Sequence, residues 1–234
     1  MPFLDLADRV REVRERIDAA AKRGGHRGEG GAGGQSVTIV AVTKTHGSDA
    51  LQAAWDAGLR DIGENKVQEA LGKMDALQLP FRWHLIGHLQ RNKVKHLSRF
   101  HRLHALDRPS LADAINKQGI AERRVFDVLV QVNVAGEETK GGYEKSELEQ
   151  ESARLRTLPS LRVLGVMTMA PFDADEGVLR RVFGAARSAR DILRSAGHTE
   201  ARELSMGMSQ DYEIAVEEGA TCVRLGAVLF GART

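Results

Sequence analysis

The sequence has few features that would link it to a disulfide scaffold, a membrane or a nucleic acid. Its one cysteine, Cys222, has no partner for an intrachain disulfide, and no apolar run approaches the roughly 20 residues of a membrane helix. The N-terminus alternates charged and apolar residues, unlike a signal peptide. The net charge is only +2, with 34 basic and 32 acidic residues. These absences favour the cytoplasm and argue against membrane or nucleic-acid partners.

A metal site is also not expected. The histidines show no ligand spacing such as H-E-x-x-H, and one cysteine is too few for a zinc site. One basic run stands out, but no aromatic residues interleave with it, so we interpret it as a solvated helix face. The run consists of Arg91, Lys93, Lys95, His96, Arg99, His101 and Arg102.

The length and the pattern of apolar runs predict the fold. The 234 residues suit one (β/α)₈ TIM barrel, which takes about 250. Eight short apolar runs alternate with helical patterns, and each run but the last is followed by a helix, including one over 90–100. An open doubly wound sheet would have nearer six strands and a G-x-G-x-x-G turn. The predicted strands are Val37–Val42, Asp61–Gly63, Trp83–Gly87, Arg102–Leu106, Phe126–Val134, Leu161–Met169, Glu203–Met206 and Cys222–Phe230.

The chain is predicted to form one α/β domain over residues 1–234. Apolar residues at helical spacing, from Leu6 to Ala20, predict an N-terminal helix over 1–24. A glycine-rich loop over 25–36 precedes the barrel at 37–231. A phosphate-binding loop follows a strand and precedes a helix, whereas here the order is reversed. We therefore expect a plain surface loop.

A lysine ends the first predicted strand. Lys44 follows the apolar run Val37–Val42, and barrel active sites lie at the carboxyl ends of strands. An amine buried among apolar walls has a lowered pKa and can form a Schiff base with an aldehyde. On its own, however, a lysine at a strand end is more often solvated.

The last two strands supply a second group of candidates. Arg224 interrupts an apolar strand, which is unfavourable unless the guanidinium meets a partner. Gly226 lies two residues on and therefore faces the same side, where a phosphate could approach the backbone. Ser209 stands near the start of the helix at 211–218, where it can be an ordinary N-cap, part of an anion site, or both together. Barrels often bind phosphate after strands seven and eight.

At these residues the sequence resembles the pyridoxal phosphate (PLP) homeostasis proteins. The matching stretches follow the order of that family over residues 37–231. They are Val40–Lys44, Gly63–Asn65, Val67–Glu69, Trp83–Gly87, Leu89–Gln90, Asn92–Lys93, Val132–Asn133, Lys140, Gly142, Gly165–Met169, Ser205–Ser209, Val223–Gly226 and Phe230–Gly231.

The resemblance implies a fold-type III PLP barrel like the N-terminal domain of alanine racemase. It implies that Lys44 holds the cofactor as a Schiff base and that Arg224 faces the pyridine nitrogen. Asn65 and His84 would lie near the ring, although His84 could equally be a core histidine. The residues implied at the phosphate are Ser205, Ser209, Gly226 and Ala227. Relatives often have threonine at the last position, and Ala227 lacks that hydroxyl, so only its amide remains for the phosphate.

The resemblance implies a carrier that keeps free PLP low, delivers it to apo-enzymes as partners, and has no catalytic residues. The alternative is an amino-acid racemase or decarboxylase of the same fold type. Such racemases use a tyrosine from a second domain, and this sequence ends at Thr234 with only Tyr143 and Tyr212, which do not match that motif. An aldolase that uses Lys44 without PLP would leave the anion site beside Arg224 unexplained.

Overall fold

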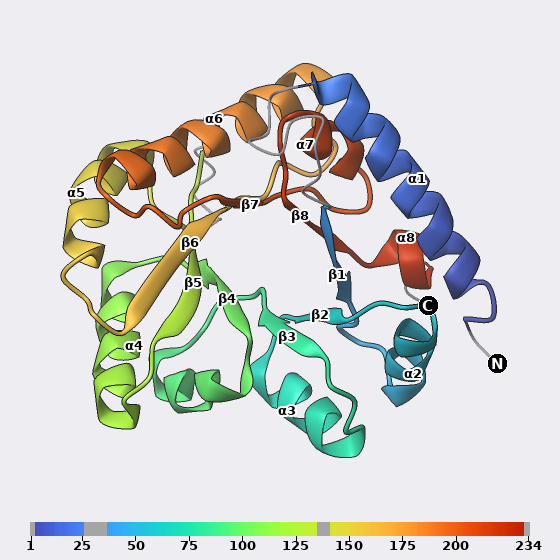
Figure 1. The fold of residues 1–234 in the computed structure, drawn as a ribbon, viewed down its shortest axis with the longest axis horizontal. Helices are drawn as coiled ribbons and strands as arrows, with labels where there is room; N and C mark the ends of the chain where they lie inside the picture. Colours follow the sequence, from blue (N-terminus) through green and yellow to red (C-terminus); the bar gives the residue numbers. More distant parts are fainter. Residues whose placement is uncertain (1–2, 26–36, 135–140, 232–234) are drawn as a thin grey trace.

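The computed structural model describes residues 3–25, 37–134 and 141–231. Eight parallel strands form a closed barrel in chain order (Figure 1). The ring closes between β1 and β8, where Val40 pairs with Arg224. The predicted barrel is therefore confirmed. The strands are β1 (Thr38–Val42), β2 (Asp61–Glu64), β3 (Arg82–Leu85), β4 (Arg102–Leu106), β5 (Phe126–Gln131), β6 (Leu161–Met167), β7 (Glu203–Ser205) and β8 (Cys222–Leu225).

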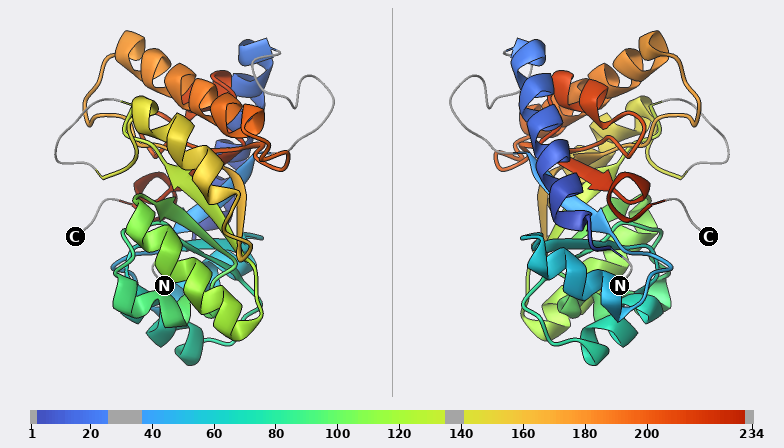
Figure 2. Two further views of the ribbon diagram at one scale, coloured as in Figure 1. Left: turned by 90° about the vertical axis from the view of Figure 1, so that its left-hand side faces the viewer. Right: turned by 90° about the vertical axis from the view of Figure 1, so that its right-hand side faces the viewer.

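Helices surround the strands (Figures 1 and 2). Their inner faces meet the outward faces of the strands in an apolar layer that includes Leu51, Ile62 and Leu103. The glycine-rich segment lies outside the described residues, apart from Gly25. The helices are α1 (Leu6–Gly24), α2 (Ser48–Asp56), α3 (Val67–Ala76), the 3₁₀ helix η2 (Arg91–Arg99), α4 (Pro109–Glu122), α5 (Lys145–Leu155), α6 (Glu176–Ser195), α7 (Tyr212–Glu217) and α8 (Ala227–Phe230).

The predicted strand over 222–230 is wrong in its second half. The strand ends at Leu225, and after Gly226 the chain turns into the short helix α8. The amide of Phe230 donates to the carbonyl of Gly226, which starts the helical turn. Because Leu229 and Phe230 are buried in this turn, their apolar character imitates a continuing strand.

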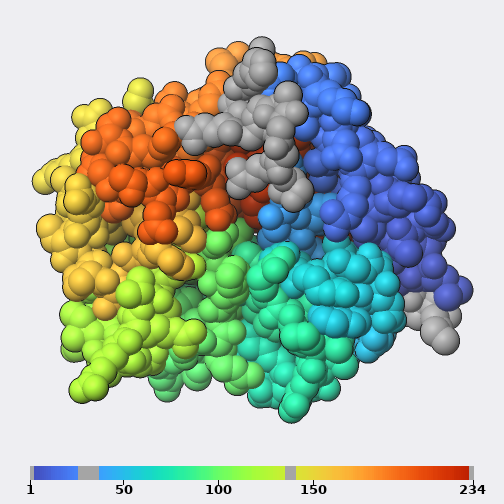
Figure 3. All heavy atoms as spheres, viewed as in Figure 1, coloured from blue at the N-terminus to red at the C-terminus, as the bar shows by residue number. Residues whose placement is uncertain are grey.

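Helix α1 stands outside the alternating repeat. Its apolar stripe, which includes Leu6, Val10 and Ile17, is buried, and the helix packs on α7, α8 and α2. In Figure 3 the blue atoms of α1 accordingly lie beside the cyan atoms of α2. At its end Gly24 touches α7 so closely that a Cβ would lie 2.5 Å from the carbonyl oxygen of Glu217. Glycine is therefore needed at this crossing.

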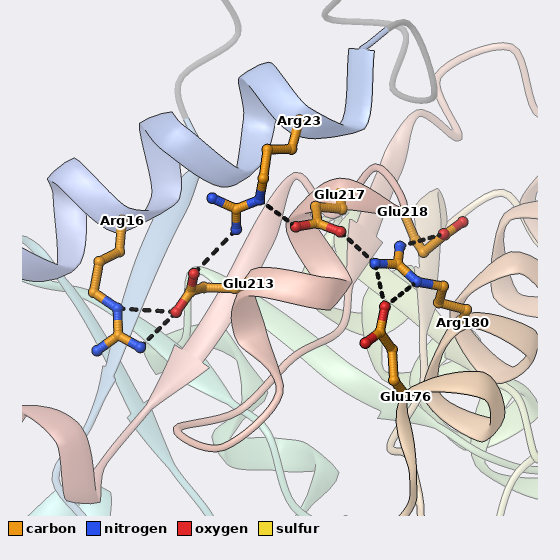
Figure 4. A network of polar contacts seen from close by, with 7 residues as sticks. All are labelled: Arg16, Arg23, Glu176, Arg180, Glu213, Glu217 and Glu218. Carbon is orange, nitrogen blue, oxygen red and sulfur yellow. Dashed lines mark hydrogen bonds and ion pairs between the residues drawn. The ribbon is translucent and has the colours of Figure 1, made fainter.

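Ion pairs bind α1 to α7 and α7 to α6 on the outside of the barrel (Figure 4). Arg23 contacts both Glu213 and Glu217 on α7, and Arg180 of α6 contacts Glu217 from the other side. We call this group the outer ion-pair network. Its members are Arg16, Arg23, Glu176, Arg180, Glu213, Glu217 and Glu218.

The interior of the barrel is polar. Side chains of β4 contact side chains of β7, and because these strands are not neighbours, the contacts must cross the lumen. Arg102 forms an ion pair with Glu203 there and is largely buried. The interpretation of the basic run as a solvated face is therefore wrong for Arg102, which belongs to β4.

In the described parts of the chain, no helix combines the length and the apolar character needed to cross a membrane. Over the same residues, no three His, Cys, Asp or Glu side chains are grouped so that they could hold a metal ion.

Candidate functional site

Lys44 follows β1 at the carboxyl end of the barrel. The amide of Thr43 still bonds to the carbonyl of Gly63 on β2, so the strand pairing continues to the residue before the lysine. Thr43 is fully buried and Lys44 is half-buried. Successive strand residues point to opposite faces, so Lys44 continues the face of Val42. The next residue, Thr45, has φ 71°, which ends the extended backbone abruptly.

A buried polar cluster holds the backbone on both sides of Lys44. The Lys73 ammonium donates to the carbonyl of Thr43 at 2.7 Å and to the carboxylate of Glu64 at 2.6 Å. Glu69 accepts from Lys73 and from the amide of Thr45, at 2.8 and 2.7 Å. We call these five residues the β1 clamp. The clamp fixes where the chain leaves β1, and therefore where Lys44 starts.

The two carboxylates of the β1 clamp differ in their electrostatics. Burial raises the pKa of Glu64, and the bond from Lys73 offsets this only in part. One of its oxygens, Oε2, has no hydrogen-bond partner among the described residues. Partial burial also acts to raise the pKa of Glu69, but the bonds from Lys73 and Thr45 outweigh it and leave the pKa lowered.

Arg224 lies inside the barrel and is only 5% exposed. Its guanidinium donates to the carbonyl and the hydroxyl of Ser205, both at 2.7 Å, and to the carbonyl of Thr168 at 2.8 Å. All three acceptors are neutral, and no carboxylate among the described residues forms an ion pair with it. Burial accordingly lowers the pKa of Arg224. A buried cation held by neutral oxygens can still interact with a further electron-rich group.

From Ser205 a line of hydrogen bonds crosses the barrel to β2. The ring of His104 bonds to Ser205 Oγ through Nδ1 and to His84 through Nε2, both at 2.9 Å. His84 in turn bonds to Asp61 through Nε2 at 2.9 Å. We call Asp61, His84, His104, Ser205 and Arg224 the inner chain. Beyond the first residue of the inner chain, Arg82 pairs with both oxygens of Asp61.

Burial controls the ionisation of the inner chain. It lowers the pKa of His84 and, more strongly, that of His104. Burial alone would raise the pKa of Asp61, but hydrogen bonds from Arg82 and His84 outweigh it and lower the pKa well below its ordinary value. The two imidazoles are therefore neutral beside a charged carboxylate.

The predicted phosphate residues lie where β7 and β8 end. The hydroxyl of Ser209 accepts from the amides of Gly226 and Val228, both at 3.2 Å. Ser209 is not an N-cap, since α7 begins at Tyr212 with Asp211 before it. Instead, Ser209 faces the start of α8, the turn that contains Ala227. These two amides converge on one oxygen, an arrangement that also suits an anion, and here that oxygen belongs to the Ser209 hydroxyl.

The other predicted residues are spread over the barrel. Asn65 is half-buried just after β2, where a Cβ on Gly87 would lie 2.4 Å from its carbonyl. His84 has both ring nitrogens bonded inside the barrel. Ser205 is fully buried and bonded to His104 and Arg224, so a bond to phosphate would require its hydroxyl to change partners. The ligand roles of all three residues stay predictions.

The sequence did not single out Asp61 or His104, nor a histidine–aspartate pair at the carboxyl end of the barrel. His88 follows β3 and bonds through Nδ1 to Asp107, which follows β4, at 2.6 Å. The histidine is 60% exposed and the aspartate 5%. This geometry leaves Nε2 of His88 directed away from the carboxylate, as in a proton-accepting histidine.

The comparisons with known proteins identify the class first. The family "Alanine racemase, N-terminal domain" matches residues 31–234. The chain is 42% identical over 232 residues to the pyridoxal phosphate homeostasis protein of Aquifex aeolicus strain VF5, with 98% of this chain and 99% of that one covered. It is 37% identical to the protein of the same name from Escherichia coli strain K12, with coverage of 98% and 97%.

A solved structure agrees with these relatives. PipY of Synechococcus elongatus PCC7942, with PLP bound, matches with a TM-score of 0.83 and 31% identity, over 97% of this chain and 100% of that chain. The chain therefore belongs to the alanine racemase N-terminal domain family and, within it, to the pyridoxal phosphate homeostasis proteins.

Proposed function

We propose that this chain binds PLP through Lys44 as a single cofactor-binding unit and acts in PLP homeostasis. The observation that carries the proposal is a buried arginine whose hydrogen-bond acceptors among the described residues are all neutral, in the same barrel as a strand-end lysine and a pair of converging amides. PipY, a relative of known structure, was solved with PLP bound. The covalent link and the site residues are our proposal.

The site suits each end of the cofactor. PLP supplies an aldehyde, and the Lys44 amine would condense with it to a Schiff base with loss of water. Ser209 and the amides of Gly226 and Ala227 would bind the phosphate at the start of α8. Arg224 would face the pyridine nitrogen and, as a cation, disfavour its protonation. An unprotonated ring withdraws electrons weakly, which suits storage better than turnover.

The tyrosines support a role without catalysis. The hydroxyl of Tyr143 donates to Glu151, and burial raises the pKa of Tyr143 above its ordinary value. Burial also raises the pKa of Tyr212, which is 2% exposed. Neither is therefore suited to exchange a proton with a substrate at neutral pH. We infer that apo-enzymes that require PLP are the recipients, and that the protein acts in the cytoplasm.

The first experiment tests the covalent link. The purified protein should be yellow, and borohydride should fix one pyridoxyl group on Lys44, located by mass spectrometry of peptides. Lys44→Ala should lose the label completely. Lys117→Ala, which removes an exposed lysine of α4, is the control and should keep it. A label that persists in Lys44→Ala would contradict the proposed link.

A second experiment separates a carrier from an enzyme. The PLP-loaded protein is incubated with a panel of amino acids, and racemisation and decarboxylation are followed by chiral chromatography and release of carbon dioxide. We expect no turnover at ordinary enzyme rates, and we expect transfer of PLP to an apo-enzyme.

The pair His88–Asp107 is the observation that favours the alternative, a racemase or decarboxylase. Turnover that is present in the wild type and lost in His88→Asn would establish that alternative.

A further inference from the structure

When both imidazoles are neutral, as burial favours, the hydrogen bonds of the inner chain admit one direction only. The carboxylate of Asp61 has no proton, so Nε2 of His84 must donate to it. In a neutral ring the other nitrogen, Nδ1, is then an acceptor, and Nε2 of His104 must donate to it. Nδ1 of His104 is therefore also an acceptor. It accepts a hydrogen bond from the Ser205 hydroxyl.

The direction ends at the arginine. Because the Ser205 hydroxyl donates to His104, its oxygen presents lone pairs to Arg224, which donates from Nη1 at 2.7 Å. Reversing any one bond would place two hydrogens, or two lone pairs, against each other. Two imidazolium rings would do the same between His84 and His104. The buried cations Arg102 and Arg224 and the neighbouring ring of His101 also favour neutral rings.

We propose that Asp61, His84 and His104 are positioning residues that orient the guanidinium of Arg224 from the opposite end of the barrel. Asp61 begins β2 at the amino-terminal end, whereas Arg224 lies near the end of β8. Asp61 determines which ring nitrogen carries the proton in His84 and in His104. These tautomers orient the Ser205 hydroxyl, and the oxygen of that hydroxyl holds one edge of the Arg224 guanidinium. As far as it concerns the cofactor, the inference rests on the proposed function.

The tautomers can be measured without the cofactor. In protein labelled with ¹⁵N-histidine and freed of PLP, His84 and His104 should both appear as neutral Nε2–H tautomers at pH 7. Spectra of His84→Asn and His104→Asn assign the signals. An Nδ1–H tautomer or an imidazolium at either position would overturn the proposal. This result does not depend on whether Lys44 binds PLP.

A matched pair of variants tests the link to the cofactor. His104→Asn keeps an acceptor near the position of Nδ1, beside Ser205, and removes the link to His84. His104→Gln keeps a donor near the position of Nε2, beside His84, and removes the acceptor for Ser205. We expect His104→Gln to shift the visible absorption of bound PLP and to speed its release about tenfold, with a smaller effect from His104→Asn.

Ser205→Ala serves as a milder change should His104→Gln fail to fold, and it should alter absorption and release in the same direction. Unchanged absorption and release in folded His104→Gln or Ser205→Ala would overturn the positioning role. If wild-type protein takes up no PLP on Lys44, the proposed function fails, whereas the tautomers still decide the direction of the inner chain.

Discussion

Two polar networks of this molecule lie in opposite surroundings and use different kinds of side chain. The outer ion-pair network consists of arginines and glutamates on the outside of the barrel, where Arg16 and Arg23 are about half exposed and Glu217 is 11% exposed (Figure 4). The inner chain has one carboxylate, two neutral imidazoles and a hydroxyl, and it ends at an arginine that is 5% exposed. The outer network is held by ion pairs, whereas in the inner chain hydrogen bonds between neutral groups connect the charged Asp61 to the charged Arg224.

The difference follows from solvent. On the surface, water and salt screen each pair, and a broken contact is replaced by hydration. Inside the barrel a group that loses its partner stays unsatisfied, at a cost of about 1–3 kcal/mol. The inner chain can therefore transmit orientation over several residues. The outer network can only add attraction between α1, α7 and α6.

The largest effect is expected where the inner chain begins. Asp61→Ala removes the acceptor of His84 and the partner of Arg82, and the aspartate side chain is only 9% exposed. We expect the free energy of unfolding to fall by about 2–3 kcal/mol, measured by urea denaturation.

Asp127→Ala is the matched control for that variant. Asp127 also stands near the start of a strand, and its two oxygens accept from Nε and Nη2 of an arginine, Arg162, at 2.7 and 2.9 Å. Among the described residues no buried histidine forms a hydrogen bond with Asp127, and Arg162 is 48% exposed. A loss of under about 1 kcal/mol is expected. Equal losses in the two variants would show that the inner chain adds nothing beyond its surface pair.

The pH dependence of stability sharpens the comparison. The pKa of His104 in the folded chain lies well below its ordinary value of 6.5 because the ring is buried. Below pH 6.5 the unfolded chain therefore binds a proton on this ring that the folded chain does not bind. Stability must therefore fall as pH decreases through this window, by up to about 1.4 kcal/mol per pH unit for this group. His84 acts in the same direction.

The variant His104→Gln isolates that contribution. Its free energy of unfolding between pH 6.5 and pH 5.5 should fall less steeply than that of the wild type. The raised pKa values of Glu64 and Glu203 act in the opposite direction but are shared by both proteins. Parallel curves would mean that His104 takes up protons equally in the folded and the unfolded chain, so that its pKa is not lowered by folding.

The sequence carried enough information for the barrel and for the charged candidates. Strands buried on both faces appear as apolar runs, and a charge within such a run, such as Arg224, stands out. The end of the last run was missed because the buried residues of α8 are as apolar as those of a strand. The identity of each site residue as a ligand stays a prediction, since the described contacts are those of the protein alone.

The inner chain could not be predicted because it depends on closure of the barrel. His104 and Ser205 are 101 residues apart and meet only because β4 and β7 face each other across the lumen. One signal was available. Both β3 and β4 begin with arginine, and each has a histidine two residues later, at His84 and His104. Residues two apart along a strand share a face, so both histidines are expected on the same side of the sheet as the arginines that begin β3 and β4. In the observed register His84 lies opposite Arg102, and His104 is two residues further along the same face.

The smallest effect is expected in the outer ion-pair network. Glu217 accepts from Arg23 and Arg180, and although partial burial acts to raise its pKa, these bonds lower it. Glu217→Gln should reduce the free energy of unfolding by about 0.5–1 kcal/mol at low salt. In 1 M NaCl the difference from the wild type should largely vanish, because the Debye length is then about 3 Å. The part of the loss in Asp61→Ala that comes from the bond to His84 should persist in the same salt, since His84 is buried away from the ions. A salt-independent loss in Glu217→Gln would place that glutamate with the buried groups and remove the contrast between the two networks.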